Sequence, residues 1–128
     1  MNPGSDMSLD QLKNWNKDLV NAARADKICA GYTDQNNITW GNRDTDIINL
    51  SGVCTLIALG VVTGNQTWRD QNNIDHVMTP TDLVTLAGGL AYYAKLCYVT
   101  SWTHKANIDA FDNINDLLNY DINTGWPG

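Results

Sequence analysis

The stretch Met78-Thr79-Pro80-Thr81-Asp82-Leu83, with the residues that follow it to about Phe111, decides the fold. Thr79 is a good N-cap, Pro80 suits the first helical position, and Asp82 follows closely enough to complete a capping box. Apolar or small residues then recur at helical spacing, and this stripe comprises Leu83, Leu86, Leu90, Ala94, Cys97, Ser101, His104 and Ile108. We therefore predict one long central helix.

Gly88 and Gly89 lie inside this predicted helix. A glycine in a helix interior costs about 1 kcal/mol relative to alanine, so the pair needs a reason. We expect another backbone to approach closely here; a kink in the helix is the alternative.

The N-terminal part predicts a second helix. Residues 1–7 have the composition of a short flexible lead. Ser8 and Gln11 then form a capping box, and Gly31 is a plausible stop, so we predict a helix over about 8–29. A chain of 128 residues has room for one hydrophobic core, which predicts a single domain over 8–128.

The middle of the chain predicts two hairpins, each followed by a helix. Residues 32–40 and 66–78 both read as strand, polar turn and strand, and the letters Asp-Gln-Asn-Asn-Ile occur in both, at 34–38 and 70–74. A helix is expected from Asp44 or Thr45 to near Gly64, and a short helical turn after Asn113. Because an isolated hairpin is marginal, we expect the two to pair into one small antiparallel sheet. The predicted fold is α+β and mainly helical, with about three main helices.

Composition excludes several classes of partner. The net charge is −6, with a pI near 4.5, which disfavours nucleic acid. No apolar run approaches the roughly 20 residues that span a bilayer, and the first residues lack a secretory signal, so we expect folding in a cytoplasm and no membrane partner. Cys29, Cys54 and Cys97 lack metal-site spacing and are expected to be reduced, buried thiols.

The sequence offers only weak candidates for catalytic or metal-binding residues. His76 and His104 are the only histidines, and a metal site would need them joined by cysteine or carboxylate ligands at suitable spacing. Cys97 shares a helix face with His104, but nothing in the sequence supplies an orienting group for a nucleophile. The many aspartates form no calcium loop and suit helix caps and solvated surface. We therefore assign no catalytic, cofactor-binding or metal-binding residue, and expect a non-enzymatic protein without a cofactor.

The five tryptophans are the best candidates for binding. Trp15 and Trp102 are expected in the core. Trp40, Trp68 and Trp126, with the adjacent Pro127, are candidate partner-binding residues, since tryptophan is enriched at binding hot spots; for these three tryptophans a core role is equally open. The Trp-Pro close to the C-terminus is too apolar for a free tail, and we expect it to dock on this chain or on a neighbour.

Three motifs resemble a known family. They are Trp68-Arg69-Asp70 with Met78-Thr79-Pro80-Thr81-Asp82-Leu83, then Trp102-Thr103-His104-Lys105-Ala106-Asn107-Ile108-Asp109-Ala110, then Tyr120-Asp121 with Gly125-Trp126-Pro127. Together with Arg43-Asp44-Thr45-Asp46, they resemble a phage-encoded domain of unknown function, found at the C-termini of tail-fibre proteins or as a small protein encoded near tail-fibre genes. The resemblance runs from about Ser8 to the end, and no fibre stalk accompanies it.

The resemblance implies a function without implying catalytic residues. For His104, within the second motif, it implies a structural hydrogen bond. We expect a bacteriophage tail structural protein, made in the host cytoplasm and present in the virion, that attaches to, caps or joins tail-fibre or baseplate proteins. The alternative is a tail-fibre assembly chaperone absent from the mature virion. An enzyme acting on host surface glycans is disfavoured. The family setting also suggests a homo-oligomer, for which a trimer is the guess, because fibres are commonly trimeric.

Overall fold

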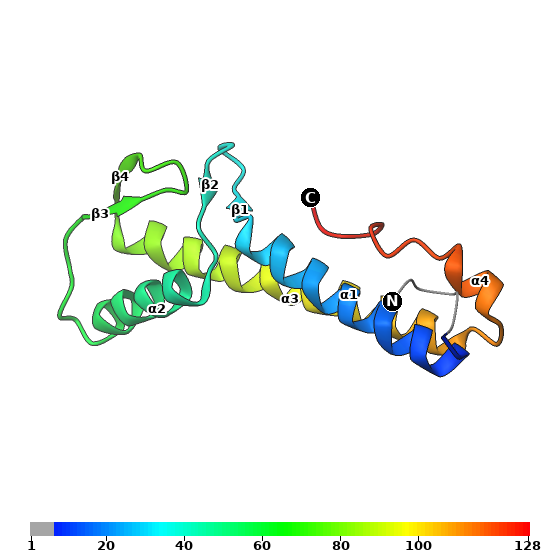
Figure 1. The fold of residues 1–128 in the computed structure, drawn as a ribbon. Helices are drawn as coiled ribbons and strands as arrows, with labels where there is room; N and C mark the ends of the chain where they lie inside the picture. The colour runs from blue at the N-terminus through cyan, green and yellow to red at the C-terminus, as the bar shows by residue number, and fades with distance from the viewer. Residues whose placement is uncertain (1–6) are drawn as a thin grey trace. The chain divides into compact units, whose positions relative to one another are not determined.

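A computed structural model describes residues 7–128 and contains four helices and four short strands (Figure 1). Their order is α1 (Leu9–Cys29), β1 (Tyr32–Thr33), β2 (Thr39–Trp40), α2 (Asp44–Ala58), β3 (Gln66–Arg69), β4 (Asp75–Met78), α3 (Pro80–Ala110) and α4 (Ile114–Leu118). The predicted α+β, mainly helical fold with a long central helix is therefore confirmed. The predicted flexible lead over 1–7 lies outside the described residues, apart from Met7.

Local capping explains where the helices begin. Ser8 and Gln11 exchange the two hydrogen bonds of a capping box before α1. Thr79 and Asp82 do the same before α3, with Thr79 N–H donating to Asp82 Oδ2 over 2.9 Å. The Asn113 side chain accepts from the backbone N–H of Asp116 and caps α4.

The second helix ends earlier than predicted. It stops at Ala58, and Gly60 adopts a left-handed conformation with φ of 74°. The N–H groups of Gly60 and Val61 turn back to the carbonyls of Ile57 and Leu56, which satisfies the last turn. Gly60, and not Gly64, is therefore the C-terminal signal.

The two hairpins have the same turn, atom for atom. Asp34 Oδ1 accepts from the N–H groups of the residues two and four positions later, at 2.8 and 3.0 Å, and Asp70 Oδ1 does likewise at 2.8 and 3.0 Å. Asn37 and Asn73 both have φ of 62°, which asparagine tolerates better than most residues. The repeated letters therefore encode a turn in which one aspartate replaces a backbone acceptor.

The prediction that the hairpins pair into one sheet is wrong. β1 pairs with β2 and β3 with β4, both antiparallel, and the result is two separate two-stranded sheets. The hairpins meet through a hydrogen bond in which Gln71 N–H donates to the Thr39 carbonyl over 2.9 Å. Gln71 belongs to a turn, so the second hairpin presents its turn to β2 and no further strand pairing follows.

The repeat extends well beyond the five matching letters. With an offset of 36 positions, residues 32–58 align with residues 68–94, so the hairpin, the cap and the helix all recur. Arg43 corresponds to Thr79 and Asp46 to Asp82, and both pairs make the same cap bond at 2.9 Å. The two helices start at equivalent positions, Asp44 and Pro80. We therefore describe residues 32–58 as copy 1 and residues 68–94 as copy 2.

Contacts within the described chain gather into two units, and each is described separately. Unit 2 comprises residues 28–95 and contains both copies. Unit 1 comprises residues 7–27 and 96–128 of the described chain. The single domain predicted over 8–128 stays a prediction.

In unit 2 the hairpin of copy 1 lies on the helix of copy 2, and the hairpin of copy 2 faces the helix of copy 1 across a pocket. Tyr32 of copy 1 packs beside Tyr93 and Gly89 of α3, in copy 2. Trp68 of copy 2 shares a pocket with Asn49 of α2, in copy 1. The shared core consists of Trp40, Leu50, Leu83, Leu86 and Leu90, drawn from both copies. The two copies therefore bury one core together.

Equivalent residues meet at the centre of unit 2. Trp40 and His76 occupy the same position in the two copies, and their ring centroids lie 5.0 Å apart. Each ring nitrogen bonds to its own turn: Trp40 Nε1–H donates to Asp34 Oδ2, and His76 Nε2–H to Asp70 Oδ2. Contact between equivalent residues is what an approximate two-fold axis between the copies produces.

Two expectations about α3 and α1 are corrected. Trp15 and Trp102 were expected in the core but are 37% and 58% exposed. The space that a side chain at Gly89 would need is taken by the Tyr32 ring and not by another backbone, and nothing lies near Gly88. Helical periodicity assigned the stripe correctly but could not tell how far the core extends around the helix.

Unit 1 is held by a second core made of Leu12, Val20, Ile108 and Leu117. Met7 and the C-terminal segment pack against it. Cys97 is buried and Cys54 half-buried, but Cys29 is exposed, so the expectation of three buried thiols is wrong for Cys29.

Candidate functional site

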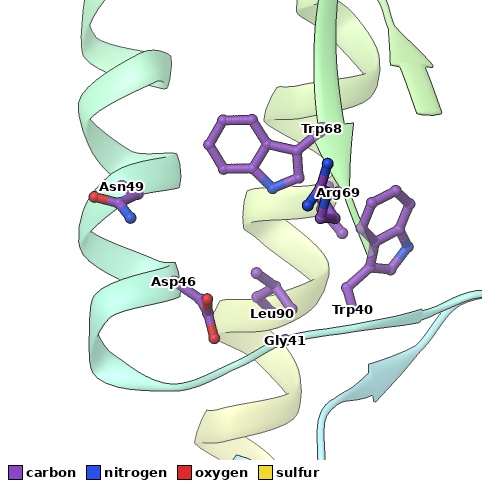
Figure 2. Close-up of a pocket in the computed structure, with 8 residues that line it drawn as sticks. Trp40, Gly41, Asp46, Asn49, Trp68, Arg69 and Leu90 are labelled. Carbon is purple, nitrogen blue, oxygen red and sulfur yellow. The ribbon is translucent and has the colours of Figure 1, made fainter. Parts of the chain in front are cut away.

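The candidate site is a pocket of about 260 Å³ in unit 2 (Figure 2). Asp46 and Asn49 of α2 line it on one side, Trp68 and Arg69 of β3 on the other, and Leu90 of α3 also lines it. Trp40, Gly41 and Leu86 complete the lining. Both copies therefore contribute side chains to this pocket.

Asp46 is fixed in the pocket by its role in the helix cap. It stands three residues after Arg43, and its Oδ2 accepts from the Arg43 backbone N–H at 2.9 Å and from Nε at 3.0 Å. Burial alone would raise the pKa of the Asp46 carboxyl, but hydrogen bonds from Arg43 lower it below its usual value. The carboxylate is therefore ionised and held in one orientation.

A polar extension of about 400 Å³ continues from the pocket past Gly41. Arg69 lies in both, and its Nε donates to Asp75 Oδ1 at 2.8 Å. A Cβ at Gly41 would stand 2.7 Å from Asp46 Oδ2 and 3.0 Å from Gln71 Oε1. A side chain at Gly41 would therefore displace Asp46 and Gln71, and glycine leaves both in place.

Several polar groups of the pocket have no protein partner. Within residues 7–128, the indole N–H of Trp68 and the side-chain amides of Asn49 and Gln71 make no hydrogen bond. Asp46 and Arg69, by contrast, are engaged with Arg43 and Asp75. The pocket thus offers neutral donors and acceptors to a ligand, while its charges are balanced internally.

The predicted partner-binding residues lie in different environments. Trp40 is 2% exposed and belongs to the core, so it cannot act as a surface anchor. Trp68 is half-buried and lines the pocket. Trp126 docks on its own chain, where its Nε1–H donates to the Ile122 carbonyl at 2.8 Å, and Pro127 beside it is half-buried. Whether Trp68, Trp126 or Pro127 contacts a partner stays a prediction.

In unit 1 the motif histidine locks the C-terminal segment. His104 is buried; its Nε2–H donates to the Thr124 carbonyl at 2.7 Å, and Nδ1 faces the Tyr120 hydroxyl at 2.5 Å. Asn107 Nδ2 donates to the same hydroxyl at 3.1 Å, and the Trp126 ring lies 5.5 Å from the imidazole. The expected structural hydrogen bond of His104 is therefore observed. His104, in the second sequence motif, thereby holds the segment that carries the third motif.

The described residues gather no group of three or more histidine, cysteine or acidic side chains that could hold a metal. Both histidines are engaged in structural hydrogen bonds, His76 to Asp70 and His104 to Thr124. Cys97 is fully buried. No helix within residues 7–128 is long and apolar enough to cross a membrane.

The fold and the pocket define a helical α+β protein with an internal hairpin–helix duplication and a polar, aromatic-lined site. Residues 11–124 match the model of the family described as Domain of unknown function (DUF4376), and the chain belongs to this family. No curated protein and no solved structure matches the chain.

Proposed function

We propose that this protein is a non-enzymatic bacteriophage tail component that attaches to, caps or joins tail-fibre or baseplate proteins. The proposal rests on the resemblance of the three sequence motifs and on one structural observation. That observation is the position of Trp102, the first residue of the motif that also carries His104 and Ile108.

The motif has an inner and an outer face on α3. His104 and Ile108 face the unit 1 core and secure the C-terminal segment. Trp102 is 58% exposed and lies beside Tyr98, with their ring centroids 6.3 Å apart. The Arg24 guanidinium covers the Tyr98 ring, 4.4 Å from its centroid. Packing of the described chain does not require the exposed tryptophan, whereas a protein partner would use it as an anchor.

Mass spectrometry of purified, salt-washed virions tests the proposal by quantifying this chain against the major tail proteins. Stoichiometric presence supports a tail component. Absence from virions, with the chain still bound to newly made fibre in infected-cell lysate, refutes the structural role and favours the alternative of an assembly chaperone. Absence from both refutes the association with tails.

A second experiment tests the surface itself. Trp102→Ala is expected to reduce co-purification with the tail partner by at least tenfold, since tryptophan hot spots contribute about 2 kcal/mol or more. Tyr92→Ala is the matched control, because Tyr92 is an aromatic residue of the same helix that is 62% exposed in unit 2. Equal binding by the two variants, with unchanged circular dichroism, would remove Trp102 from the interface.

A further inference from the structure

Unit 2 contains a second pocket beside the first hairpin, of about 430 Å³. The internal repeat makes its lining equivalent to that of the first pocket and its extension. In each, a hairpin of one copy supplies an aromatic ring and a glutamine, and the helix of the other copy supplies a polar side chain. The corresponding residues stand 36 positions apart: Tyr32 and Trp68, Gln35 and Gln71, Thr85 and Asn49.

The equivalence extends to the carboxylates. Asp82 lines the second pocket as Asp46 lines the first, and each accepts the backbone N–H that caps its helix at 2.9 Å. Neither carboxylate is therefore free to collapse into its pocket. Two sites of one chain thus present an aromatic ring, a glutamine, a carboxylate and a polar helix residue at equivalent positions.

Both pockets have unused hydrogen-bonding groups. The Tyr32 hydroxyl and the Gln35 amide, like the Trp68 indole and the Gln71 amide, make no hydrogen bond within the described chain. Aromatic rings beside them supply apolar surface, and Leu86 lines both pockets. A fitting ligand therefore has polar edges rich in donors and acceptors, and apolar C–H faces.

Charge and size narrow the class of ligand. A carboxylate in each pocket disfavours phosphates and other anions. The arginine of the first pocket is already paired with Asp75, which leaves no free cation to attract them. The first pocket, at about 260 Å³, lies just below the usual range of about 300–1,000 Å³ for drug-sized ligands, so it suits one ring-sized unit better than an extended peptide.

We propose that the two pockets are equivalent binding sites, each of which accepts one neutral pyranose unit of a saccharide. Hydroxyl groups of the sugar bond to the glutamine amide, the capping carboxylate and the polar residue of the helix. Its C–H face packs against the aromatic ring. One chain therefore binds two units. This inference does not depend on a role in phage tails.

Two-dimensional ¹H–¹⁵N NMR of the full-length labelled chain tests the proposal directly. The probes are the methyl glycosides of glucose, galactose, mannose and N-acetylglucosamine, each titrated at millimolar concentrations. The indole N–H signal of Trp68 is expected to shift with at least one probe. The indole signal of Trp126 is the internal reference, because that N–H donates to Ile122 in unit 1.

Two variants separate the sites. Asn49→Ala is expected to weaken binding at the first pocket about tenfold and leave the second unchanged, and Thr85→Ala to do the reverse. Asn115→Ala, an exposed asparagine of α4 in unit 1, is the matched control. Preserved amide spectra in all variants establish that the fold is intact.

Four outcomes would overturn the proposal. One is that no glycoside of the panel shifts Trp68 in the folded protein. Another is that the glycoside shifts the Trp68 signal of the Asn49→Ala variant as strongly as that of the Asn115→Ala control. The third is a shift produced by a neutral peptide such as Gly-Ser-Gly-Ser but by no glycoside, which would make the pockets peptide sites. Saturation at one ligand per chain would refute the equivalence of the two pockets.

Discussion

Gly89→Ala probes the closest contact between a hairpin and the helix of the other copy. A methyl group on Gly89 would stand 2.8 Å from Tyr32 Cε2 and 2.9 Å from its Cζ and Oη. Carbon contacts are optimal near 3.5–4.0 Å, so the ring would have to move by roughly 0.6–1.2 Å. Such overpacking costs about 1–3 kcal/mol.

The helix itself gains from the same substitution. Replacing a helical glycine with alanine contributes about 1 kcal/mol. Gly89→Ala is therefore expected to lower the free energy of unfolding by about 0–2 kcal/mol. Gly88→Ala is the matched control, because Gly88 is exposed and has nothing within 4 Å; it is expected to raise the free energy of unfolding by about 1 kcal/mol.

Urea denaturation followed by circular dichroism measures both variants, with the slope of the transition checked for constancy. In a Tyr32→Ala background the clash is absent, so Gly89→Ala should then stabilise as Gly88→Ala does. Equal stabilisation by the two substitutions in the natural sequence would refute the contact between Tyr32 and Gly89.

Three further predictions concern hydrogen bonds and charges. Tyr120→Phe removes the hydroxyl that faces His104 and is expected to cost about 1–3 kcal/mol, with faster amide exchange over residues 120–126; unchanged exchange would contradict the lock. The pKa of the Asp70 carboxyl is lowered below its ordinary 3.8, chiefly by the hydrogen bond from the histidine of its hairpin. The ionised Asp70 carboxylate contributes its full stabilisation above pH 3.8, and this contribution is lost as the pH falls through the lower pKa of the folded state. In Asp70→Asn the free energy of unfolding should therefore decrease less steeply with falling pH below about pH 4. Arg69→Gln breaks an exposed ion pair with Asp75 and is expected to leave the melting temperature almost unchanged; a large decrease would show that the pair anchors the hairpin.

The sequence predicts the helices and turns of this fold well, because capping and turn residues act locally. Thr79, Pro80 and Asp82 mark the start of α3, which begins where they indicate. The repeated Asp-Gln-Asn-Asn-Ile letters identify both turns. Sequence identity between the two copies is low in their helices, however. Equivalent positions such as Ile47 and Leu83 are both apolar but are not identical, so the full length of the repeat was missed.

The same sequence patterns could not predict which hairpin packs against which helix. Period and propensity say that a hairpin forms but not which helix it will cover, so the packing of Tyr32 on α3 was not predicted. The exposed Trp102 was misassigned because an aromatic residue beside an apolar stripe is ambiguous.

The candidate site was only partly predicted. Trp68 was identified as a binding candidate and lines the pocket, but Asn49 and Asp46 were not. Asp46 carried a signal as a helix cap, and its second role becomes visible only when β3 is placed opposite α2. Comparing the two copies at an offset of 36 positions pairs Asn49 with Thr85 and Asp46 with Asp82, but the pairing alone does not place them in a pocket.

The core that the two copies share has a consequence for folding in concentrated solution. Copy 1 and copy 2 are joined through residues 59–67, and their mutual contacts do not require that both belong to one chain. Two molecules could trade a copy and rebuild the same cores, with chain entropy as the main difference. Shortening this connection removes the slack that lets the copies fold back on each other. We expect such a variant to shift from monomer to domain-swapped dimer as its concentration rises.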